Sequence, residues 1–546
     1  MLRALAQRVP WDGNAAAAQA AYALSETSFI YPITPATPMG ELFDSWIAQG
    51  KKNVWGHPVH LSMLQAEGGA AGALHGAASA GTLSVSFTAS QGLLLMIPDL
   101  YKLAGEYCPA VVHVTARSIA TGGLSIYGDH GDIYAARMSG IPMICSSSVQ
   151  EAHDIAAITH LTTIKTCLPF VHFFDGFRTS HEINTYKVLD HDTLRQMVDE
   201  EGIAKMRARS MNPEHPSVRG TILGPEFVFQ ASEKANETYA ALPYEVEKMM
   251  ETFGKFVGRV YKPFEYTGPH DAEYAIISMG SGAAVVDQFC RTHPSAKVGS
   301  VKIHLYRPFD ARMLNNCLPP TVKRICVLDK YRDPTGVREP LFTDVAAGLH
   351  GKRDVRIIGG RFGLGSKDFN PAHVTAIVKN LTSEIPKDGF TVGINAPETM
   401  LPIGPPQDHL PASTKQCIFW GLGSDGTVGA NKEAIKLIVD NTEKYGQAYF
   451  AYSAHKSGGI TTSHLRFGDE PVDAPYLISA ADYIACHNPA YIWKFSMLEP
   501  LKEGGVVVLN IPDSCDFEKE LPNSVKKQIA QKKARLYRID ASDIAA

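Results

Sequence analysis

Paired cysteines, long apolar runs and a strong net charge are all missing from this chain of 546 residues. None of its nine cysteines lies within a C-x-x-C spacing of another, so the signature of a zinc site or of a [4Fe–4S] cluster is absent. The cysteines are Cys108, Cys145, Cys167, Cys290, Cys317, Cys326, Cys417, Cys486 and Cys515. Scattered single cysteines fit a reducing compartment, where a thiol acts as a small apolar side chain.

No apolar run approaches the roughly 20 residues that a membrane-spanning helix needs. The longest candidate, residues 91–98, is short and ends in Pro98. The formal net charge is -4 and the pI is about 6.6, and neither value favours nucleic acid or an anionic membrane as a partner. With 45% hydrophobic and 20% charged residues, the composition is that of an ordinary globular protein with full cores.

What the chain does contain is a repeated alternation of short strands with helices. Runs rich in β-branched residues at 28–31, 83–88 and 110–115 alternate with helical stretches such as 12–23. This pattern is typical of an α/β fold with a parallel sheet and helices on both faces. At about 150 residues each, the length allows three or four such domains.

The same pattern returns twice further along the chain. Residues 275–283 predict a strand, a turn and a helix, and 298–306 and 324–329 predict two more strands. After a proline-rich linker at 385–412, residues 416–432 again predict a strand, a glycine-rich loop and a helix. We therefore expect three consecutive α/β domains with mainly parallel sheets flanked by helices. Their expected ranges are 1–255, 256–395 and 396–546.

Three motifs in the first domain place reactive side chains among small residues and turn formers. They are Tyr31-Pro-Ile-Thr-Pro-Ala-Thr-Pro38, Gln65-Ala-Glu-Gly-Gly-Ala-Ala-Gly72 and Ala116-Arg-Ser-Ile-Ala-Thr-Gly-Gly-Leu-Ser-Ile-Tyr-Gly-Asp-His130. Such motifs suit a site at the carboxyl ends of parallel strands. A ligand can approach the backbone closely where Cβ atoms are absent.

In this order, the three motifs resemble the pyruvate:ferredoxin (flavodoxin) oxidoreductase family of 2-oxoacid oxidoreductases. The resemblance implies that the first domain binds the aminopyrimidine half of thiamine diphosphate together with the 2-oxoacid. Tyr306-Arg-Pro-Phe309 and Glu339-Pro-Leu341 resemble the family's second domain, a relative of the transketolase C-terminal domain. The Gly280-Ser-Gly282 turn there is either structural or a weak phosphate site.

The resemblance implies three catalytic residues, and each has a structural alternative. Glu67 would bind the pyrimidine N1′, or it would only interact with the dipole of a helix N-terminus. Thr34 would contact the carboxylate and carbonyl of the substrate, or it would cap the next helix, as Thr37 would do equally well. Arg117 would bind the 2-oxoacid carboxylate through two hydrogen bonds, or it would form a surface or interdomain salt bridge.

The cluster Gly128-Asp-His-Gly-Asp132 leaves two alternatives open. It suits metal or acid–base chemistry, and it equally suits a loop that side-chain hydrogen bonds hold in place. We name no residue in it as catalytic, and we predict no metal site in this chain.

The third domain holds a glycine-rich loop whose family role is coenzyme A docking. The loop resembles the magnesium motif of thiamine diphosphate enzymes, but Asn431 follows Asp425 too soon for that motif. A glycine-rich loop at a helix start still suits a phosphate. The predicted cofactor-binding residues of the chain are Glu67, Gly423, Asp425, Gly426, Asn431, Lys432, Lys456 and Arg466, the last three as cations.

Full-length members of the family continue into iron–sulfur domains and a domain with the diphosphate–magnesium site. The resemblance thus implies the N-terminal part of an enzyme that converts pyruvate and coenzyme A to acetyl-CoA, CO2 and reduced ferredoxin or flavodoxin. It uses thiamine diphosphate with Mg2+, and the [4Fe–4S] clusters belong to the remaining part. We expect a homodimer.

Two alternatives remain open. One is the N-terminal part of a pyruvate:NADP+ oxidoreductase, which differs in an appended reductase. The other is a catalytically silent scaffold related to sulfite reductase flavoprotein subunits. The start Met1-Leu-Arg-Ala-Leu-Ala-Gln-Arg-Val9 is either a frayed terminus or a short leader for a hydrogenosome or related organelle. Otherwise we expect a cytoplasmic protein.

Overall fold

The computed structural model describes residues 7–452, 459–512, 516, 519 and 521–545. Residues 1–6, most of the predicted leader, and Lys456 lie outside the described residues. The chain forms two compact units. The first consists mainly of Asp12–Ser180 and Lys187–Gly404, and the second of Arg8–Trp11, His181–Tyr186 and Pro405–Ala546. The division into three domains stays a prediction.

The first unit contains a sheet of seven strands in the order β12-β6-β7-β5-β4-β2-β3. The strands are β2 (Thr27–Ile30), β3 (His60–Met63), β4 (Ser84–Thr88), β5 (Ala110–Ala116), β6 (Met143–Ser146), β7 (Phe170–Asp175) and β12 (Leu305–Arg307). All neighbours run parallel except β12, which is antiparallel to β6. The strands expected at 28–31, 83–88 and 110–115 are confirmed within one residue at each end.

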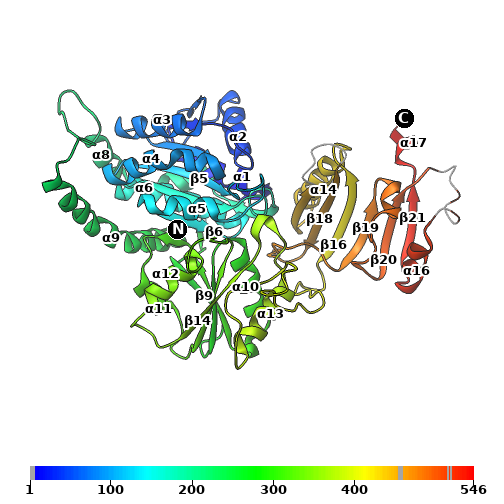
Figure 1. Ribbon diagram of the computed structural model, residues 1–546. Helices are drawn as coiled ribbons and strands as arrows, with labels where there is room; N and C mark the ends of the chain where they lie inside the picture. The colour runs from blue at the N-terminus through cyan, green and yellow to red at the C-terminus, as the bar shows by residue number, and fades with distance from the viewer. Residues whose placement is uncertain (1–6, 453–458, 513–515, 517–518, 520, 546) are drawn as a thin grey trace. The chain divides into compact units, whose positions relative to one another are not determined.

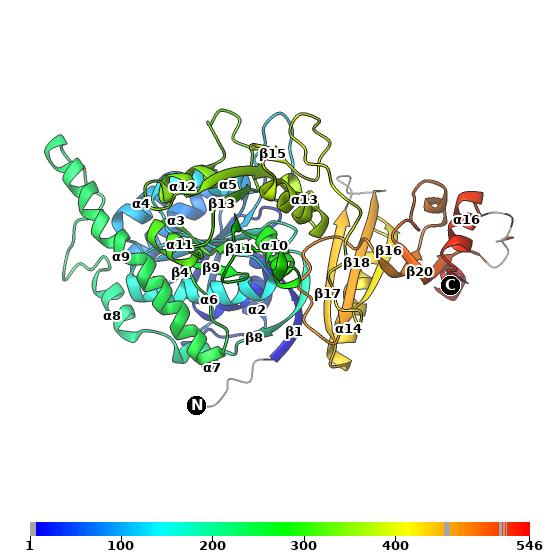
Figure 2. The same ribbon diagram turned by 90° about the horizontal axis from the view of Figure 1, so that it is seen from below.

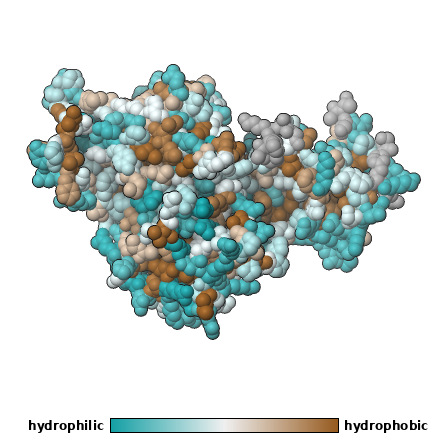
Figure 3. Space-filling model, in the orientation of Figure 1, coloured by the Kyte–Doolittle hydropathy of each residue, from teal (hydrophilic) through white to brown (hydrophobic). Residues whose placement is uncertain are grey.

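Helices cover both faces of this sheet, as expected for a parallel sheet (Figure 1). They are α1 (Gly13–Ala23), α2 (Thr37–Ala48), α3 (Glu67–Ser79), α4 (Ser90–Glu106), α5 (Gly131–Ala136), α6 (Val149–Thr166), α7 (His191–Gln196), α8 (Glu200–Ala208) and α9 (Pro225–Val257). The pairs α3–α4 and α1–α6 pack against each other. Figure 2 shows the start of α9 extending away from the rest of the unit. Several apolar side chains near that start are exposed, among them Ile222, Phe227 and Phe229, and Figure 3 shows apolar surface there.

A second sheet in the same unit has six strands in the order β15-β14-β13-β10-β11-β9. They are β9 (Phe264–Thr267), β10 (Tyr274–Ser278), β11 (Val298–Ile303), β13 (Arg324–Asp329), β14 (Arg356–Arg361) and β15 (Phe390–Thr391). Only β9 is antiparallel to its neighbour. The helices around it are α10 (Ser281–Thr292), α11 (Ala311–Cys317), α12 (Pro340–Leu349) and α13 (Pro371–Thr382). One continuous apolar core runs from α3 and α4 through to this second sheet.

The second unit contains a mixed sheet of eight strands in the order β1-β8-β17-β18-β16-β19-β20-β21. They are β1 (Gln7–Asp12), β8 (Ile183–Val188), β16 (Lys415–Leu422), β17 (Tyr445–Tyr452), β18 (Ile460–Gly468), β19 (Ala481–Cys486), β20 (Leu501–Asn510) and β21 (Arg535–Ile539). Among its described residues, the helices of regular α type are α14 (Thr427–Asn441), α16 (Asn523–Gln531) and α17 (Ala541–Ala545). None of the described helices in either unit is both long and apolar enough to cross a membrane.

The α/β fold is confirmed, but two details of the prediction are wrong. The single strand expected at 298–306 is two strands in different sheets. Between them, the backbone N–H of His304 donates to the Pro263 carbonyl, and the His304 carbonyl accepts from the backbone N–H of Cys145. The sheet expected to be mainly parallel in the third domain is mixed, because β18 is antiparallel to both β16 and β17. It also takes in β8, far upstream in the chain.

Candidate active site

Four adjacent strands of the first sheet, β5-β4-β2-β3, end at the same edge. The segments that follow them carry Thr34 after β2, Glu67 after β3, Ser90 after β4 and Arg117 after β5. Parallel strands present their carboxyl ends together, and ligands of open α/β sheets bind there. The fold therefore brings the three predicted catalytic residues to one edge, together with a fourth segment that the sequence analysis did not use.

Glu67 is the first residue of α3 and is only 6% exposed. Its carboxylate has no hydrogen-bond or ion-pair partner within the described part of the chain. The side chain packs against Gly92 in the first turn of α4: a Cβ atom there would lie 2.9 Å from Glu67 Oε1 and 2.5 Å from Thr88 Oγ1. Position 92 therefore has to be glycine for the carboxylate to lie where it does.

Two further polar atoms in the segment that leads to Gly92 are buried and have no hydrogen-bond partner among the described residues. They are Thr88 Oγ1, at the end of β4, and Gln91 Nε2, in the first turn of α4. Buried polar groups cost free energy unless they are hydrogen-bonded, and most in native structures are. The groups left unpaired in this part of the chain that the structure describes are thus the acceptor oxygens of Glu67, the hydroxyl of Thr88 and the amide NH2 of Gln91. Such a set fits a flat polar ring that carries both donors and acceptors, such as an aminopyrimidine.

Arg117 and Thr34 are in direct contact, but through the backbone of Thr34. Arg117 Nη1 donates to the Thr34 carbonyl at 2.8 Å, and Nε donates to the Ser125 carbonyl at 3.3 Å. Arg117 is 6% exposed, and burial lowers its pKa. Among the described residues no carboxylate forms an ion pair with Arg117, so the structure does not support the salt-bridge alternative, and Nη2 remains able to bind an anion.

The Thr34 side chain is exposed at the rim of this edge. Helix α2 begins at Thr37, its N-cap is Ala36, and no side chain caps it. The capping alternative for Thr34 and Thr37 is therefore not observed. No hydrogen bond or ion pair joins Glu67 to Thr34 or to Arg117 within the described residues, so Glu67 shares the edge with the Arg117–Thr34 pair but is not bonded to it.

In the cluster at 128–132 every acidic or basic side chain is engaged within the protein. Asp129 accepts from Ser118 Oγ at 2.5 Å, and His130 Nε2 lies 2.7 Å from Asp175 Oδ1. Asp132 accepts three backbone N–H groups, and burial raises its pKa to about 7. These bonds support the alternative in which the cluster holds a loop in place.

The loop after β5 is also braced from the second sheet. Lys330 Nζ donates to Asp175 Oδ2 at 2.8 Å, and the Lys330 carbonyl accepts from the His130 N–H. Ser281, in the Gly280-Ser-Gly282 turn, donates its N–H to the same carboxylate at 3.0 Å. That turn therefore has a structural contact, as the first of its two alternatives expects.

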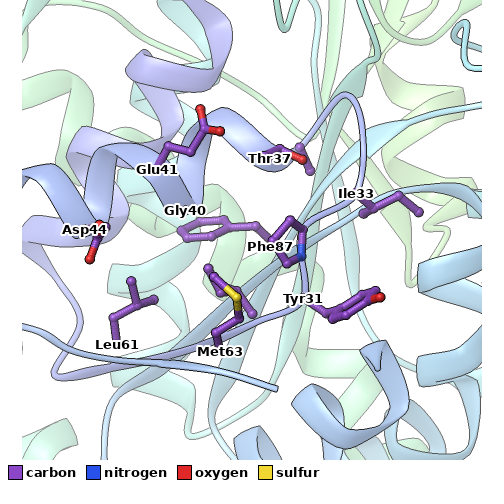
Figure 4. A pocket seen from close by; sticks show the side chains of 12 residues that line it. Tyr31, Ile33, Thr37, Gly40, Glu41, Asp44, Leu61, Met63 and Phe87 are labelled. Atoms are coloured by element: carbon purple, nitrogen blue, oxygen red, sulfur yellow. The ribbon is translucent and has the colours of Figure 1, made fainter. Parts of the chain in front are cut away.

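A separate cavity of about 360 Å³ is lined in part by residues of the loop that carries Thr34. Figure 4 shows Ile33, Leu61, Met63 and Phe87 around it, with Glu41 and Asp44 at its side. Neither Glu67 nor Arg117 lines it. The cavity is therefore next to the candidate site and not part of it.

One group of side chains in the described residues has metal-ligating atoms within 4.8 Å of one another: His75, Glu106 and Cys108. The ammonium of Lys102 is ion-paired with Glu106, and burial raises the pKa of the Cys108 thiol. Both features oppose a cation at this position.

The glycine-rich loop of the second unit connects β16 to α14, as predicted. The carboxylate of Asp425 accepts the N–H of Leu422 at 2.7 Å and the N–H of Thr427 at 2.8 Å, so it is used within the loop. Helix α14 begins after Gly426 without a side-chain cap. Asn431 is 3% exposed, and its Nδ2 has no partner in the described residues. Lys432 Nζ lies 5.7 Å from the Phe450 ring centre.

Arg466 is placed differently from the expectation of a cation that meets a phosphate. It is 1% exposed in the centre of the sheet. Its guanidinium donates to side-chain oxygens of Gln416 and Gln447 and to the carbonyls of Ala474 and Tyr476. The Nε and Nη1 donors of Arg466 are thus used within the sheet, and a role for this residue in phosphate binding stays a prediction.

Sequence reasoning missed Ser90 and Gly92, and it named Asp132 only as a member of the cluster at 128–132. A signal was present in Thr88-Ala-Ser-Gln-Gly92, a run of small and polar residues directly after a buried strand. For Asp132 no local signal existed, because its two more distant partners are 15 and 42 residues away.

Three family models match the chain. Residues 19–251 match the thiamine-diphosphate-binding domain of pyruvate flavodoxin/ferredoxin oxidoreductase, residues 272–374 match core domain II of pyruvate:ferredoxin oxidoreductase, and residues 416–546 match a further pyruvate ferredoxin/flavodoxin oxidoreductase domain.

Curated relatives match over nearly the whole chain. Pyruvate:ferredoxin oxidoreductase of Moorella thermoacetica is 49% identical over 98% of this chain and 46% of its own length. The mitochondrial pyruvate dehydrogenase (NADP+) of Euglena gracilis is 50% identical over 98% of this chain and 30% of its own length. The chain thus spans less than half the length of these relatives. Among solved structures, 2-oxoglutarate:ferredoxin oxidoreductase of Magnetococcus marinus, with 2-oxoglutarate, coenzyme A and succinyl-CoA bound, has a TM-score of 0.53 at 17% identity, covering 69% of this chain and 65% of that one, which supports the fold.

Proposed function

This chain belongs to the pyruvate:ferredoxin/flavodoxin oxidoreductase family, and from that premise we propose that it forms the N-terminal part of an enzyme that oxidatively decarboxylates pyruvate. The products are acetyl-CoA, CO2 and reduced ferredoxin or flavodoxin. The observation that supports this most is a buried, unpaired Glu67 against Gly92, at the same sheet edge as an Arg117 that forms no ion pair among the described residues.

Thiamine diphosphate, when bound, supplies the electron sink that decarboxylation of a 2-oxoacid requires. In this proposal Glu67 holds a proton at the pyrimidine N1′, and Thr88 and Gln91 satisfy polar atoms of the same ring. Arg117 binds the substrate carboxylate through Nη2, and its bonds to Thr34 and Ser125 orient it. The Thr34 hydroxyl lies at the rim and contacts the carbonyl of the substrate.

The remaining components are part of the proposal as well. Mg2+ with the diphosphate and the [4Fe–4S] clusters belong to the portion of the relatives that this chain does not span. Coenzyme A docks at the loop of Gly423 and Gly426, near Asn431 and Lys432. We further propose a homodimer and a mitochondrion-derived organelle as its location, for which the mitochondrial relative of Euglena is the support.

The test replaces Glu67 by Ala or Gln in the full-length enzyme. We expect loss of nearly all pyruvate-dependent acceptor reduction with an unchanged fold by circular dichroism. Glu237, exposed on α9, gives a control: Glu237→Gln should keep full activity. Retained turnover in Glu67→Ala would contradict the proposal, and a comparison of pyruvate with 2-oxoglutarate as substrates would test the choice of 2-oxoacid.

A second candidate is the N-terminal part of a pyruvate:NADP+ oxidoreductase. The Euglena relative of that kind is as similar to this chain as the Moorella ferredoxin enzyme, at 50% and 49% identity. The two enzymes would share the site described here. Reduction of NADP+ by the purified full-length enzyme without added ferredoxin would favour this candidate.

A further inference from the structure

We infer that Asp132 is a positioning residue that fixes both the backbone of Arg117 and the start of α4 in the candidate active site. The inference rests on the proposed function for its consequence in catalysis. Asp132 lies in the first turn of α5 and is fully buried. Its Oδ2 accepts the N–H of Ser90 at 2.8 Å and the N–H of Arg117 at 3.0 Å. Its Oδ1 accepts the N–H of Ile133 at 2.8 Å.

The bond to Ser90 holds a strained turn. Ser90 has a φ of +50°, in the left-handed region that side chains other than glycine rarely adopt. Such a conformation persists only where the surroundings hold it in place. Here the N–H is held by Asp132, and the hydroxyl donates to the Ser118 carbonyl at 2.6 Å. Two residues later in the same turn, Gly92 packs against Glu67. A shift of Ser90 would therefore move Gly92 and change the space around the Glu67 carboxylate.

The bond to Arg117 fixes the other half of the site. Arg117 has its backbone N–H on Asp132 and its guanidinium on the carbonyls of Thr34 and Ser125. With both ends fixed, the guanidinium loses little entropy when it binds a carboxylate. One buried oxygen, Asp132 Oδ2, therefore fixes the position of Arg117 relative to Gly92, the residue that packs against Glu67.

An ordinary helix cap would not explain these contacts. A carboxylate at a helix start commonly accepts N–H groups of its own first turn, as Oδ1 does with Ile133. Oδ2 instead bonds two N–H groups that are 42 and 15 residues away in the sequence and that follow different strands. The carboxylate thus connects the ends of β4 and β5 at the edge where the candidate site lies.

The test is Asp132→Asn in the full-length enzyme. The amide has the same shape but only one acceptor oxygen, so its NH2 must face either Ile133 or the pair Ser90 and Arg117. We expect KM for the 2-oxoacid to rise about tenfold, the effect of losing about 1.4 kcal/mol of binding, with a smaller change in kcat. Labelling of Arg117 by phenylglyoxal, mapped by mass spectrometry on the enzyme without substrate, should become faster.

Asp329 provides a matched control. It is equally buried, it accepts the N–H groups of Leu341 and Phe342 and the Tyr134 hydroxyl of α5, and burial raises its pKa to about 7 as well. Asp329→Asn should lower the melting temperature about as much as Asp132→Asn does. In Asp329→Asn, however, KM should stay within about twofold of wild type, and the labelling rate of Arg117 should not change.

The pH profile gives a second readout that a purely structural role would not move. Protonation of Asp132 replaces an acceptor by a donor, as the amide does. Two charged groups act on it: Asp129, whose negative charge raises the Asp132 pKa, and Arg117, whose positive charge opposes that. In the wild type, KM for the 2-oxoacid should rise as the pH falls from 8 to 6 through the pKa of about 7. Asp132→Asn should lack this rise, and Asp329→Asn should keep it.

An Asp132→Asn enzyme with wild-type KM, pH profile and labelling of Arg117 would overturn the inference. If Asp132→Asn does not fold, the pH dependence of the wild type and the labelling of Arg117 at pH 8 and pH 6 decide it instead. A wild-type enzyme without activity on any 2-oxoacid would overturn the proposed function, and the labelling experiment would still decide the inference.

Discussion

Two helix starts in this molecule look alike in sequence and differ in what their carboxylates do. At the start of α3, Glu67 is buried and unpaired among the described residues, beside an unpaired hydroxyl and amide. At the start of α14, Asp425 is exposed, yet both of its oxygens bond backbone N–H groups of its own loop. The comparison teaches that a carboxylate in a glycine-rich turn indicates a ligand site only where the fold leaves it without a partner.

The largest effect should come from adding one methyl group beside Glu67, and the same change in the first turn of α14 is its control. Gly92→Ala would place a Cβ 2.9 Å from Glu67 Oε1 and 2.5 Å from Thr88 Oγ1, so the carboxylate must move. We expect at least about a 100-fold loss of kcat/KM in the full-length enzyme, since small misplacements in a site cost that much. Gly429→Ala in α14 meets nothing within 4 Å and should keep activity while stabilising the helix by about 0.5–1 kcal/mol. Equal activity of the two variants would contradict the comparison.

The next largest effect, on stability, should come from three buried histidines, two on strands of the first sheet and one on α6. His113 Nδ1 lies 2.8 Å from His172 Nδ1, and His113 Nε2 lies 3.0 Å from His160 Nε2. Burial lowers the pKa of His160 and of His172 to about 3. Because the unfolded chain binds these protons from pH 6.5 downward and the folded protein does not, each group lowers stability as the pH falls.

His160→Leu removes one of these groups. Between pH 7 and pH 5 the wild type should lose about 2 kcal/mol more of its free energy of unfolding than the variant does. Urea unfolding at several pH values measures this difference. Asp132 and Asp329 affect the pH dependence of stability in the opposite direction, but they do so equally in both proteins, so their contributions cancel in the comparison. Parallel pH dependences of the two proteins would show that His160 is protonated in the folded state.

Substitutions of Glu67 and of Asp425 should change the free energy of unfolding in opposite directions. Glu67→Gln removes a buried, unpaired charge and should raise the free energy of unfolding by about 1 kcal/mol. Asp425→Ala removes two bonds at a helix start and should lower it by about 1 kcal/mol. Chemical denaturation of the chain with each substitution checks both values. Destabilisation by Glu67→Gln would mean that Glu67 has a partner.

The smallest effect concerns Lys432. Its position near the α14 start predicts that Lys432→Ala raises KM for coenzyme A about threefold to tenfold, as expected for the loss of one solvated phosphate contact. Lys436, one turn further along α14, serves as the control. A coenzyme without the 3′-phosphate, compared in both variants, shows which phosphate is involved, and an unchanged KM would remove Lys432 from the site.

Much of the first site could be predicted from local sequence. The strands β2, β4 and β5, the helix start at Glu67 and the position of Arg117 after a strand all follow from apolar runs and turn residues within a few positions of each other. The hydrogen bond from Arg117 to the backbone carbonyl of Thr34 was not predicted, because no local pattern indicates that these two segments meet. The burial of Arg466 in the centre of a sheet could not be predicted, because an arginine after a polar stretch looks the same in sequence whether it faces solvent or the sheet interior.

The sequence by itself determined which segments become strands and helices and which loops carry reactive groups, because those depend on periodicity and on glycine and proline nearby. Only the tertiary structure decided which of these groups keep a polar atom without a hydrogen-bond partner in the described residues. Asp132 meets Ser90 and Arg117, and β8 joins β17, through packing between segments far apart in the chain. Such pairings are set by how distant segments assemble into sheets and pack against them, and no local pattern records them.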